Sequence, residues 1–257
     1  MAILKTQGLI IKEINVGEAD KIFTIFTRSH GKIKASARGV RNPRSRLVSG
    51  TQFLCYSDFV LYKGKEIYRI SQSQVIKNFY NLRTSIEKLS YATYFADLTS
   101  EVIEENYPSN KILNLLLNTL YLLSETDKDP MLLKAVYELR LMSIIGYTPN
   151  LINCSNCGTA ENLKYFSSKA GGLICIQCAK NAQQGRNFEL SQGTIQAMRY
   201  IIYSPVDKIF SFKVSQRILK ELNNILSDFI ITHTETEIKS LKYLNNILEM
   251  NKEEKNI

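Results

Sequence analysis

The spacing of the apolar residues changes near residue 80 of this 257-residue chain, and no other feature limits its fold as strongly. Before that point, short runs rich in Ile, Val, Thr, Phe and Tyr alternate with turn signals such as His30-Gly31 and Asn42-Pro43, a pattern typical of strands. The expected strands cover approximately residues 3–12, 20–27, 31–40, 51–62 and 66–76. Five short strands predict a small barrel.

From Leu82 onward, the apolar residues recur every three or four positions, as they do along the buried face of an amphipathic helix. This spacing covers residues 113–123, 132–142, 219–229 and 241–248. Asp129 and Pro130 mark one helix start, with an N-cap residue followed by proline at the first helical position. The sequence therefore predicts an α+β multidomain protein. Its barrel domain covers 1–80, and its all-α domain covers 81–257 with a cysteine-bearing insert at about 150–182.

Positive charge gathers in the barrel region. Residues 1–80 hold 14 Lys and Arg against five Asp and Glu, so they carry the whole formal excess of +9, whereas residues 81–257 hold 19 of each sign. A basic module beside a neutral one attracts polyanions, most often nucleic acid, although an anionic membrane surface is the alternative. Size, strand number and charge together favour a five-stranded oligonucleotide-binding (OB) barrel.

No stretch is expected to cross a membrane, because the most apolar one, residues 112–124, is far shorter than the ~20 residues that a bilayer requires. Lys5 and Lys12 interrupt the first apolar run, so no secretory leader is expected. Five cysteines, in two close pairs plus Cys55, suit a reducing compartment and a metal. We therefore expect a cytoplasmic protein that binds no membrane.

The two close pairs are Cys154 with Cys157 and Cys175 with Cys178, separated by 17 residues, which is a spacing found in tetrathiolate zinc sites. Glycines after the first pair and before the second permit a turn and a hairpin that bring the pairs together. Four sulfur atoms complete the coordination of Zn²⁺, so we expect one structural zinc ion per chain. Two disulfides or unliganded thiols are the alternatives.

The segment His233-Thr-Glu235 matches half of a zinc-deaminase signature, but in that signature the cysteine pair follows the His-x-Glu element, whereas here both pairs precede it. We expect His233 near a helix end at the surface and His30 in a solvated turn. The sequence also contains no phosphate-binding loop, no Gly-x-Gly-x-x-Gly, no Ser-His-Asp set and no carboxylate cluster suited to two metals. It therefore predicts a protein that is not an enzyme.

Between Asp20 and Asp58 the chain has eight basic residues and no acidic one. Strand alternation puts Lys32, Lys34 and Arg38 on one face, with residues 33, 35 and 37 on the other. Successive cations on this face lie ~6.6 Å apart, so they can follow a phosphate backbone without reading base sequence. The expected nucleic-acid contacts are Lys32, Lys34 and Arg38, joined by Arg28, Arg41, Arg44 and Arg46. A purely solvated face is the alternative.

The next strand also alternates, with Tyr56 and Tyr62 on the face opposite Phe59 and Leu61. The two tyrosines are candidates for stacking on unpaired bases, each stack contributing ~1–3 kcal/mol. Aromatic residues of small barrels also pack in the core or at the rim, so this alternative stays open.

Several short motifs, spread over nearly the whole chain, are distinctive when they are taken as a set. They are Gly17-Glu-Ala-Asp20, Thr24 to Thr27, His30-Gly-Lys-Ile33, Ala37-Arg-Gly39, Arg44-Ser-Arg46, the four paired cysteines and Lys239-Ser-Leu-Lys-Tyr-Leu244. As a set they resemble the RecO family of bacterial recombination-repair mediators over nearly the whole chain. The resemblance implies an OB barrel, a helical domain and an inserted zinc finger. Some members lack the full set of four cysteines, which fits a structural metal.

The same resemblance implies a cytoplasmic, nucleoid-associated protein that binds single- and double-stranded DNA and anneals complementary strands. It further implies that the protein works with RecR to help RecA replace single-stranded-DNA-binding protein (SSB) during repair. Cations that neutralise phosphates lower the repulsion between two strands, and base pairing supplies the free energy without ATP. A zinc-dependent nuclease stays open as another class, as does an interaction scaffold that recruits repair or transcription proteins with only incidental DNA affinity.

Overall fold

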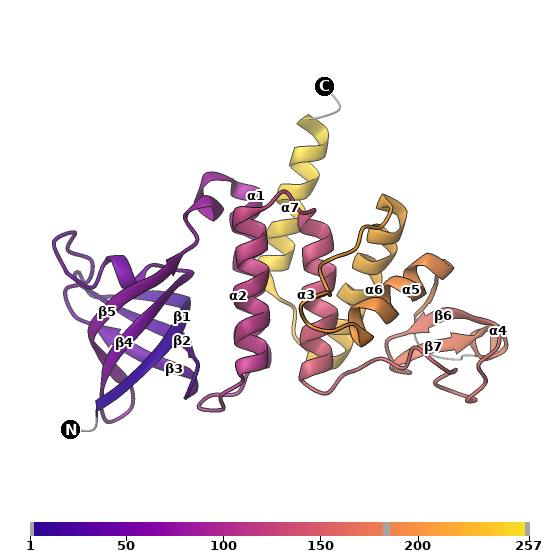
Figure 1. The fold of residues 1–257 in the computed structure, drawn as a ribbon, viewed down its shortest axis with the longest axis horizontal. Coiled ribbons are helices and arrows are strands. Elements are labelled where there is room, and N and C mark those ends of the chain that lie inside the picture. Colours follow the sequence, from indigo (N-terminus) through magenta and orange to yellow (C-terminus); the bar gives the residue numbers. More distant parts are fainter. Residues whose placement is uncertain (1–2, 182–185, 255–257) are drawn as a thin grey trace. The chain divides into compact units, whose positions relative to one another are not determined.

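The computed structural model describes residues 3–181 and 186–254. Its first five strands close into a barrel in the order β1-β2-β3-β5-β4 (Figure 1). They are β1 Ile3–Val16, β2 Asp20–Thr27, β3 Gly31–Ala37, β4 Cys55–Lys63 and β5 Tyr68–Asn78. Paired strands are antiparallel except β3 and β5, which run parallel. This is the predicted five-stranded barrel, and its connectivity agrees with an OB barrel.

Alternate side chains of the strands fill the barrel. Most of them are β-branched or aromatic, which suits a pleated strand with one buried face. They are Ile10, Phe23, Ile25, Ile33, Ala35, Ala37, Phe59, Leu61 and Ile70, joined by Val40. The β3–β4 connection contains one short 3-10 helix, η1 Ser49–Thr51. This apolar interior fixes which side chains of each strand are left for the outer face.

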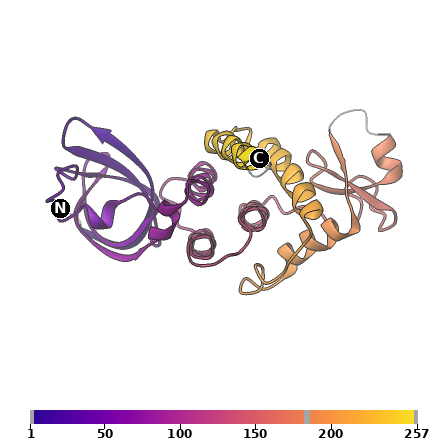
Figure 2. The same ribbon diagram turned by 90° about the horizontal axis from the view of Figure 1, so that it is seen from above.

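Three helices belong to the same compact unit as the barrel, which comprises the described residues up to Asp127 and from Ile238 onward. They are α1 Ile86–Val102, α2 Asn110–Glu125 and α7 Lys239–Glu254, preceded by the 3-10 helix η2 Tyr80–Thr84. Helix α1 packs against both α2 and α7, so the last helix of the chain returns to this unit (Figures 1 and 2). The hydroxyl oxygens of Ser85 and Ser109 accept hydrogen bonds from backbone N–H groups in the first turns of α1 and α2.

The second compact unit is Lys128–Glu237. It contains α3 Pro130–Ile144, β6 Leu163–Ser167, β7 Gly172–Cys175, α4 Ile176–Lys180, β8 Asn187–Glu189, α5 Gln192–Tyr203 and α6 Gln216–Thr234. The predicted start of α3 is confirmed, because the Asp129 carboxylate accepts a hydrogen bond from the backbone N–H of Met131 at 2.8 Å and Pro130 opens the helix. Helix α3 packs against α5 and α6, and the three short strands form a sheet in the order β7-β6-β8.

The predicted fold class is confirmed: a five-stranded barrel comes first, helices follow, and the four-cysteine segment lies among the helices. The predicted domain limits, 1–80 and 81–257, stay a prediction, since the compact units group elements by their contacts and not by chain order. Among the described residues, no helix has the length and apolar character that a membrane crossing requires.

Candidate nucleic-acid interface and metal centre

The alternation expected along the basic strand is present in β3. Residues 33, 35 and 37 are buried in the barrel, whereas Lys34 and Arg38 are exposed and Lys32 is half-buried. Arg38 is the first residue after the end of β3. The three cations therefore lie on the outer face, but the two ends of this face have different surroundings.

The chain segment that follows helix α1 covers the first end of the face. The backbone N–H of Asn106 donates to the carbonyl oxygen of Lys32 at 3.0 Å, and Glu105 pairs with Lys32 as an isolated parallel bridge. The Lys32 ammonium donates to the carbonyl oxygen of Ser100 at 2.6 Å, and Lys34 forms an ion pair with Glu105 at 2.8 Å. We call this region, residues 31–34 together with 100–107, the covered end.

A glycine is required where this segment approaches the barrel. Gly31 has a φ of +62°, and a Cβ atom added there would clash with the backbone of Tyr107. The close approach therefore depends on the absence of a side chain at the first residue of β3.

Burial lowers the pKa of Lys32 from its ordinary value, although the negative charges of Glu105 and Glu101 act in the opposite direction. The hydrogen bond from Lys34 lowers the pKa of Glu105. The Lys34 and Glu105 side chains are 54% and 53% exposed, so their pairing contributes only ~0–1 kcal/mol to stability. Lys34 is therefore only weakly held by Glu105, whereas Lys32 is held by burial.

The second end of the face lies open, and the strand register brings further residues to it. Arg69 of β5 stands opposite both Ser36 of β3 and Tyr62 of β4. Directly opposed residues share a face, and Arg38 shares it with Ser36 because it follows two positions later. Arg38, Tyr62 and Arg69 thus gather on one side of the barrel, which we call the open end.

A cavity of about 550 Å³ lies at the open end. Its lining includes three cationic, one aromatic and two apolar side chains: Arg38, Lys63, Arg69, Tyr62, Leu47 and Ile70. Lys63 and Arg69 were not among the predicted contacts. The alternation of a single strand cannot reveal them, because they reach the site through pairing between strands.

The arginine loop, residues 39–46, follows Arg38. The Arg41 guanidinium donates to the carbonyl oxygen of Gly17 at 2.8 Å, so it is held against the β1–β2 turn. Arg44 and Arg46 are exposed, and their side chains form no ion pair with any residue that the structure describes. Two loop arginines are thus available to a polyanion beside the open end.

Arg28 and Tyr56 lie in another part of the barrel surface. The Arg28 guanidinium donates to the Tyr56 hydroxyl at 3.3 and 3.4 Å and to Asn114 of α2 at 3.4 Å. The Tyr56 hydroxyl in turn donates to Gln7 at 3.0 Å, and Tyr56 is only 6% exposed. Burial of Tyr56 favours the packing alternative for this residue, whereas Tyr62 is half-exposed; base stacking by either tyrosine stays a prediction.

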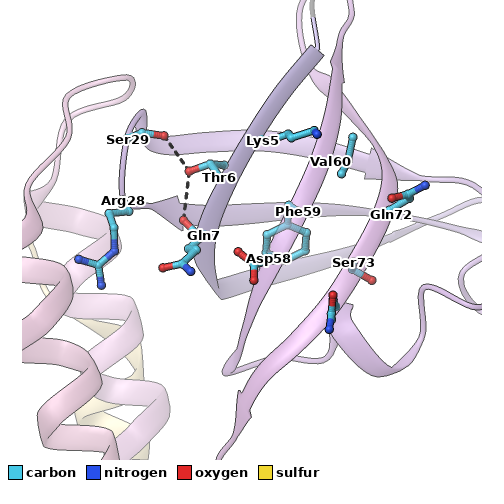
Figure 3. A pocket seen from close by; sticks show the side chains of 11 residues that line it. Lys5, Thr6, Gln7, Arg28, Ser29, Asp58, Phe59, Val60, Gln72 and Ser73 are labelled. Atoms are coloured by element: carbon cyan, nitrogen blue, oxygen red, sulfur yellow. Dashed lines mark hydrogen bonds between the residues drawn. The ribbon is translucent and has the colours of Figure 1, made fainter.

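A second hollow, of about 710 Å³, adjoins Arg28 on the outer face of β1, β4 and β5. Figure 3 shows that its wall is mainly polar and uncharged, with Thr6 and Ser29 hydrogen-bonded to each other. In the same view, the Arg28 side chain points toward the neighbouring helices. Lys5 and Asp58 contribute opposite charges to this hollow. It therefore lacks the uniform charge of the open end.

The four paired cysteines meet in the second compact unit. Their Sγ atoms all lie within 4.8 Å of one another, and those of Cys157 and Cys175 are 3.8 Å apart. A disulfide requires about 2.0 Å between sulfurs, whereas four thiolates about 2.3 Å from one Zn²⁺ ion stand roughly 3.8 Å apart along each edge of the tetrahedron. The arrangement fits a tetrahedral metal site better than two disulfides.

Backbone N–H groups point at the sulfur atoms. The N–H of Cys175 donates to the sulfur of Cys154 at 3.3 Å, and that of Cys178 donates to the sulfur of Cys175 at 3.4 Å. Burial of Cys154 opposes its ionisation, but backbone hydrogen bonds from residues 156, 157 and 175 prevail and lower its pKa to about 6. Hydrogen bonds to Cys157 and Cys175 raise the pKa of Cys178 to about 12. A bound cation would favour thiolate at all four positions.

His233 does not join this cluster, since the only metal-binding group found among the described residues consists of the four cysteines. It lies in the last turn of α6, with its ring stacked on Tyr147 at 4.6 Å and edge-on to Phe229 at 4.4 Å between centroids. The deaminase alternative therefore gains no support from the geometry.

The protein has an OB-type barrel with a cationic open end, followed by helices and a four-cysteine finger. Its class is therefore that of proteins in which a candidate polyanion-binding module is joined to a helical one. The first 79 residues match the family described as "Recombination protein O N terminal", and residues 83–242 match "Recombination protein O C terminal". The chain therefore belongs to the RecO family.

Individual relatives agree with this assignment. The chain is 42% identical to the "DNA repair protein RecO" of Acetivibrio thermocellus, over 96% of this chain and 98% of that protein. It is 35% identical to the protein of the same name from a Thermoanaerobacter species, over 97% and 100%, and 36% identical to that of Alkaliphilus metalliredigens, over 90% and 94%. The predicted family is thus confirmed over nearly the whole length.

Proposed function

We propose that this RecO-family DNA repair protein binds single- and double-stranded DNA through its barrel and anneals complementary strands without catalysing a reaction. The observation that carries the proposal is the open end, where Arg38, Lys63 and Arg69 lie side by side beside the arginine loop. Phosphate neutralisation by such a surface lowers the repulsion between two strands, so base pairing can drive annealing without a nucleotide cofactor.

The four cysteines hold a structural Zn²⁺ ion in this proposal. Support comes from the spacing of the sulfur atoms, the backbone N–H groups aimed at two of them and a ligand set that leaves no position for water or substrate. The ion supplies stability to the finger, whose three strands are only five, four and three residues long.

The partners in this proposal are RecR, SSB and RecA, which the family resemblance implies. The protein and RecR together help RecA to replace SSB on single-stranded DNA during repair. A neutral helical region beside the basic barrel is compatible with a division of labour in which the barrel binds DNA and helices contact proteins.

A strand-annealing assay without nucleotide tests the proposal. Wild-type protein is expected to accelerate annealing of complementary oligonucleotides, and its affinity for single-stranded DNA is expected to fall with salt. If about six phosphates are neutralised, log affinity against log salt has a slope near −4. A slope near zero, or no acceleration, would contradict the proposal.

A second candidate function is an interaction scaffold with only incidental DNA affinity. It is favoured by the engagement of Lys32 and Lys34 within the chain, which removes part of the predicted phosphate contacts. Pull-down of RecR or SSB after nuclease treatment, combined with the annealing assay, separates the two. Capture of these proteins without annealing would support the scaffold.

A further inference from the structure

The open-end cavity brings cationic side chains together with an aromatic one. Its cations Arg38, Lys63 and Arg69 form no ion pair or side-chain hydrogen bond with any described residue. Tyr62, which pairs with Arg69 in the β4–β5 ladder, adds a half-exposed aromatic side chain to the same lining. In contrast, the hollow of Figure 3 contains Asp58 and an arginine already bonded to Tyr56 and Asn114.

The strand register makes this combination compact. Tyr62 and Arg69 are directly opposed in the β4–β5 ladder, where Cβ atoms of such pairs lie ~4.5–5.5 Å apart. On its other side, Arg69 pairs with Ser36 of β3, and Arg38 follows Ser36 by two positions on the same face. An aromatic ring with one guanidinium group beside it and a second one beyond presents a stacking surface and charge-assisted donors to one small ligand.

The size of the cavity suits one nucleotide. Its volume of about 550 Å³ falls within the ~300–1,000 Å³ typical of sites for small ligands. Leu47 and Ile70 add apolar wall, which suits the flat ring of a base better than a bare phosphate ion. The exposed arginines of the adjoining loop then continue the cationic surface toward neighbouring phosphates.

We propose that the open-end cavity receives one unpaired nucleotide of a DNA strand, with its base stacked on Tyr62 and its phosphate held by Arg38 and Arg69. This inference rests on the proposed function, because a strand must reach the barrel. It also sets a preference for single strands, since a base within a duplex is paired and stacked and must leave the helix at a cost of a few kcal/mol before it can enter.

The test compares the affinity of the full-length protein for three ligands: an oligo(dT) strand, a strand of equal length made of abasic sites, and a duplex. Wild-type protein is expected to bind oligo(dT) more tightly than the abasic strand. Tyr62→Ala is expected to lose about fivefold to 150-fold on oligo(dT), the change that corresponds to the loss of one base stack of ~1–3 kcal/mol. It should lose less than twofold on the abasic strand and the duplex.

Two substitutions serve as controls. Tyr62→Phe keeps the ring and should retain wild-type affinity for oligo(dT). Tyr203→Ala removes an exposed tyrosine at the end of α5 and should change nothing. The comparison of oligo(dT) with the abasic strand on wild-type protein requires no variant, so it holds even if Tyr62→Ala proves unstable on heating.

The outcomes separate the two proposals. If wild-type protein binds none of the three ligands, the proposed function fails. If wild-type protein binds all three without preferring bases, or if Tyr62→Ala loses the same factor on every ligand or on none, DNA binding stands and the nucleotide pocket is overturned.

Discussion

The two ends of the outer face of β3 carry similar charge but differ in what surrounds it. At the covered end, Lys32 and Lys34 are engaged by the segment that follows α1. At the open end, Arg38 lines the same cavity as Arg69 and Lys63, and no described acidic side chain pairs with them. This difference shows that the number of cationic residues in a strand does not by itself predict how strongly the strand binds a polyanion. What matters is how many of them lack a partner within the protein.

The same contrast applies to the two tyrosines of β4. Tyr56 and Tyr62 share a face of the strand, but Tyr56 pairs with Leu9 of β1, which is buried although it neighbours the core residue Ile10 in the sequence. Helix α1 contacts β1, so part of the outer surface of the barrel is covered. Tyr62 lies at the other end of the strand and keeps part of its ring exposed.

The largest loss of DNA affinity is expected from reversing two charges at the open end. Each reversal in Arg38→Glu/Arg69→Glu changes the local charge by two units, and a unit pair at 4 Å is worth ~1 kcal/mol in water, so the expected loss is on the order of 10²–10³-fold. Fluorescence anisotropy with a labelled single strand measures it. The matched control Lys213→Glu/Lys220→Glu makes the same charge change at exposed positions of the second unit and should cost far less. Equal losses in both variants would mean that only net charge matters.

A smaller change of opposite sign is expected from Glu105→Gln at the covered end. Removing the carboxylate releases Lys34 for a phosphate, which should raise the affinity for single strands up to about fivefold, in keeping with the ~0–1 kcal/mol of an exposed ion pair. Lys34→Gln is the matched control and should not gain affinity. A loss of affinity in Glu105→Gln would indicate that the covering segment itself binds DNA.

The pH dependence of this effect follows from Glu105. Lys34 holds the pKa of the Glu105 carboxyl below its ordinary value, so the ion pair is present at neutral pH and is lost as the pH falls through that lowered pKa. The gain of Glu105→Gln over wild type should therefore be constant near pH 7 and vanish in acid, below the ordinary range of a glutamate. A gain that persists unchanged at acid pH would exclude the ion pair as its cause.

No change of DNA affinity is expected from Tyr56→Phe. The substitution removes a hydroxyl that donates to Gln7 and accepts from Arg28, so the free energy of unfolding should fall by ~0.5–1.5 kcal/mol, as urea denaturation would measure. Affinity for oligo(dT) should stay within twofold of wild type. A clear loss of affinity at unchanged stability would indicate that the base binds at Tyr56 and not at Tyr62.

Removal of the metal should also leave DNA affinity unchanged while it destabilises the finger. Cys175→Ser breaks the ligand set at a residue that also caps α4, and structural Zn²⁺ contributes ~10–16 kcal/mol of binding energy in zinc-finger peptides. Metal analysis of the purified protein should give one zinc per chain, and the variant should lose it. Four titratable thiols without zinc in the wild-type protein would contradict the structural metal.

Alternation and spacing were sufficient to predict much of this molecule. The five strands, four of the helices and the four cysteines follow from apolar periods and one ligand motif, which are local properties of the chain. Helix α1 was not singled out, because Tyr91, Tyr94, Phe95 and Leu98 bury several of its sides and leave no single apolar stripe.

The residues that surround the cations could not be predicted from the local sequence pattern. Glu105 lies about 70 residues from Lys34 in the sequence, in an irregular segment without a period. Arg69 faces Tyr62 only through a register that is shifted by an irregularity between Val60 and Leu61. Both relations depend on tertiary pairing, which a single strand pattern does not encode.

Hydrogen–deuterium exchange of the full-length protein with and without oligo(dT) compares the two ends most directly. Binding at the open end should slow exchange in residues 38–47 and 62–70 while residues 31–34 and 100–107 exchange as in the free protein. Slowed exchange at the covered end alone, or none anywhere in the barrel, would contradict the assignment of DNA to the open end.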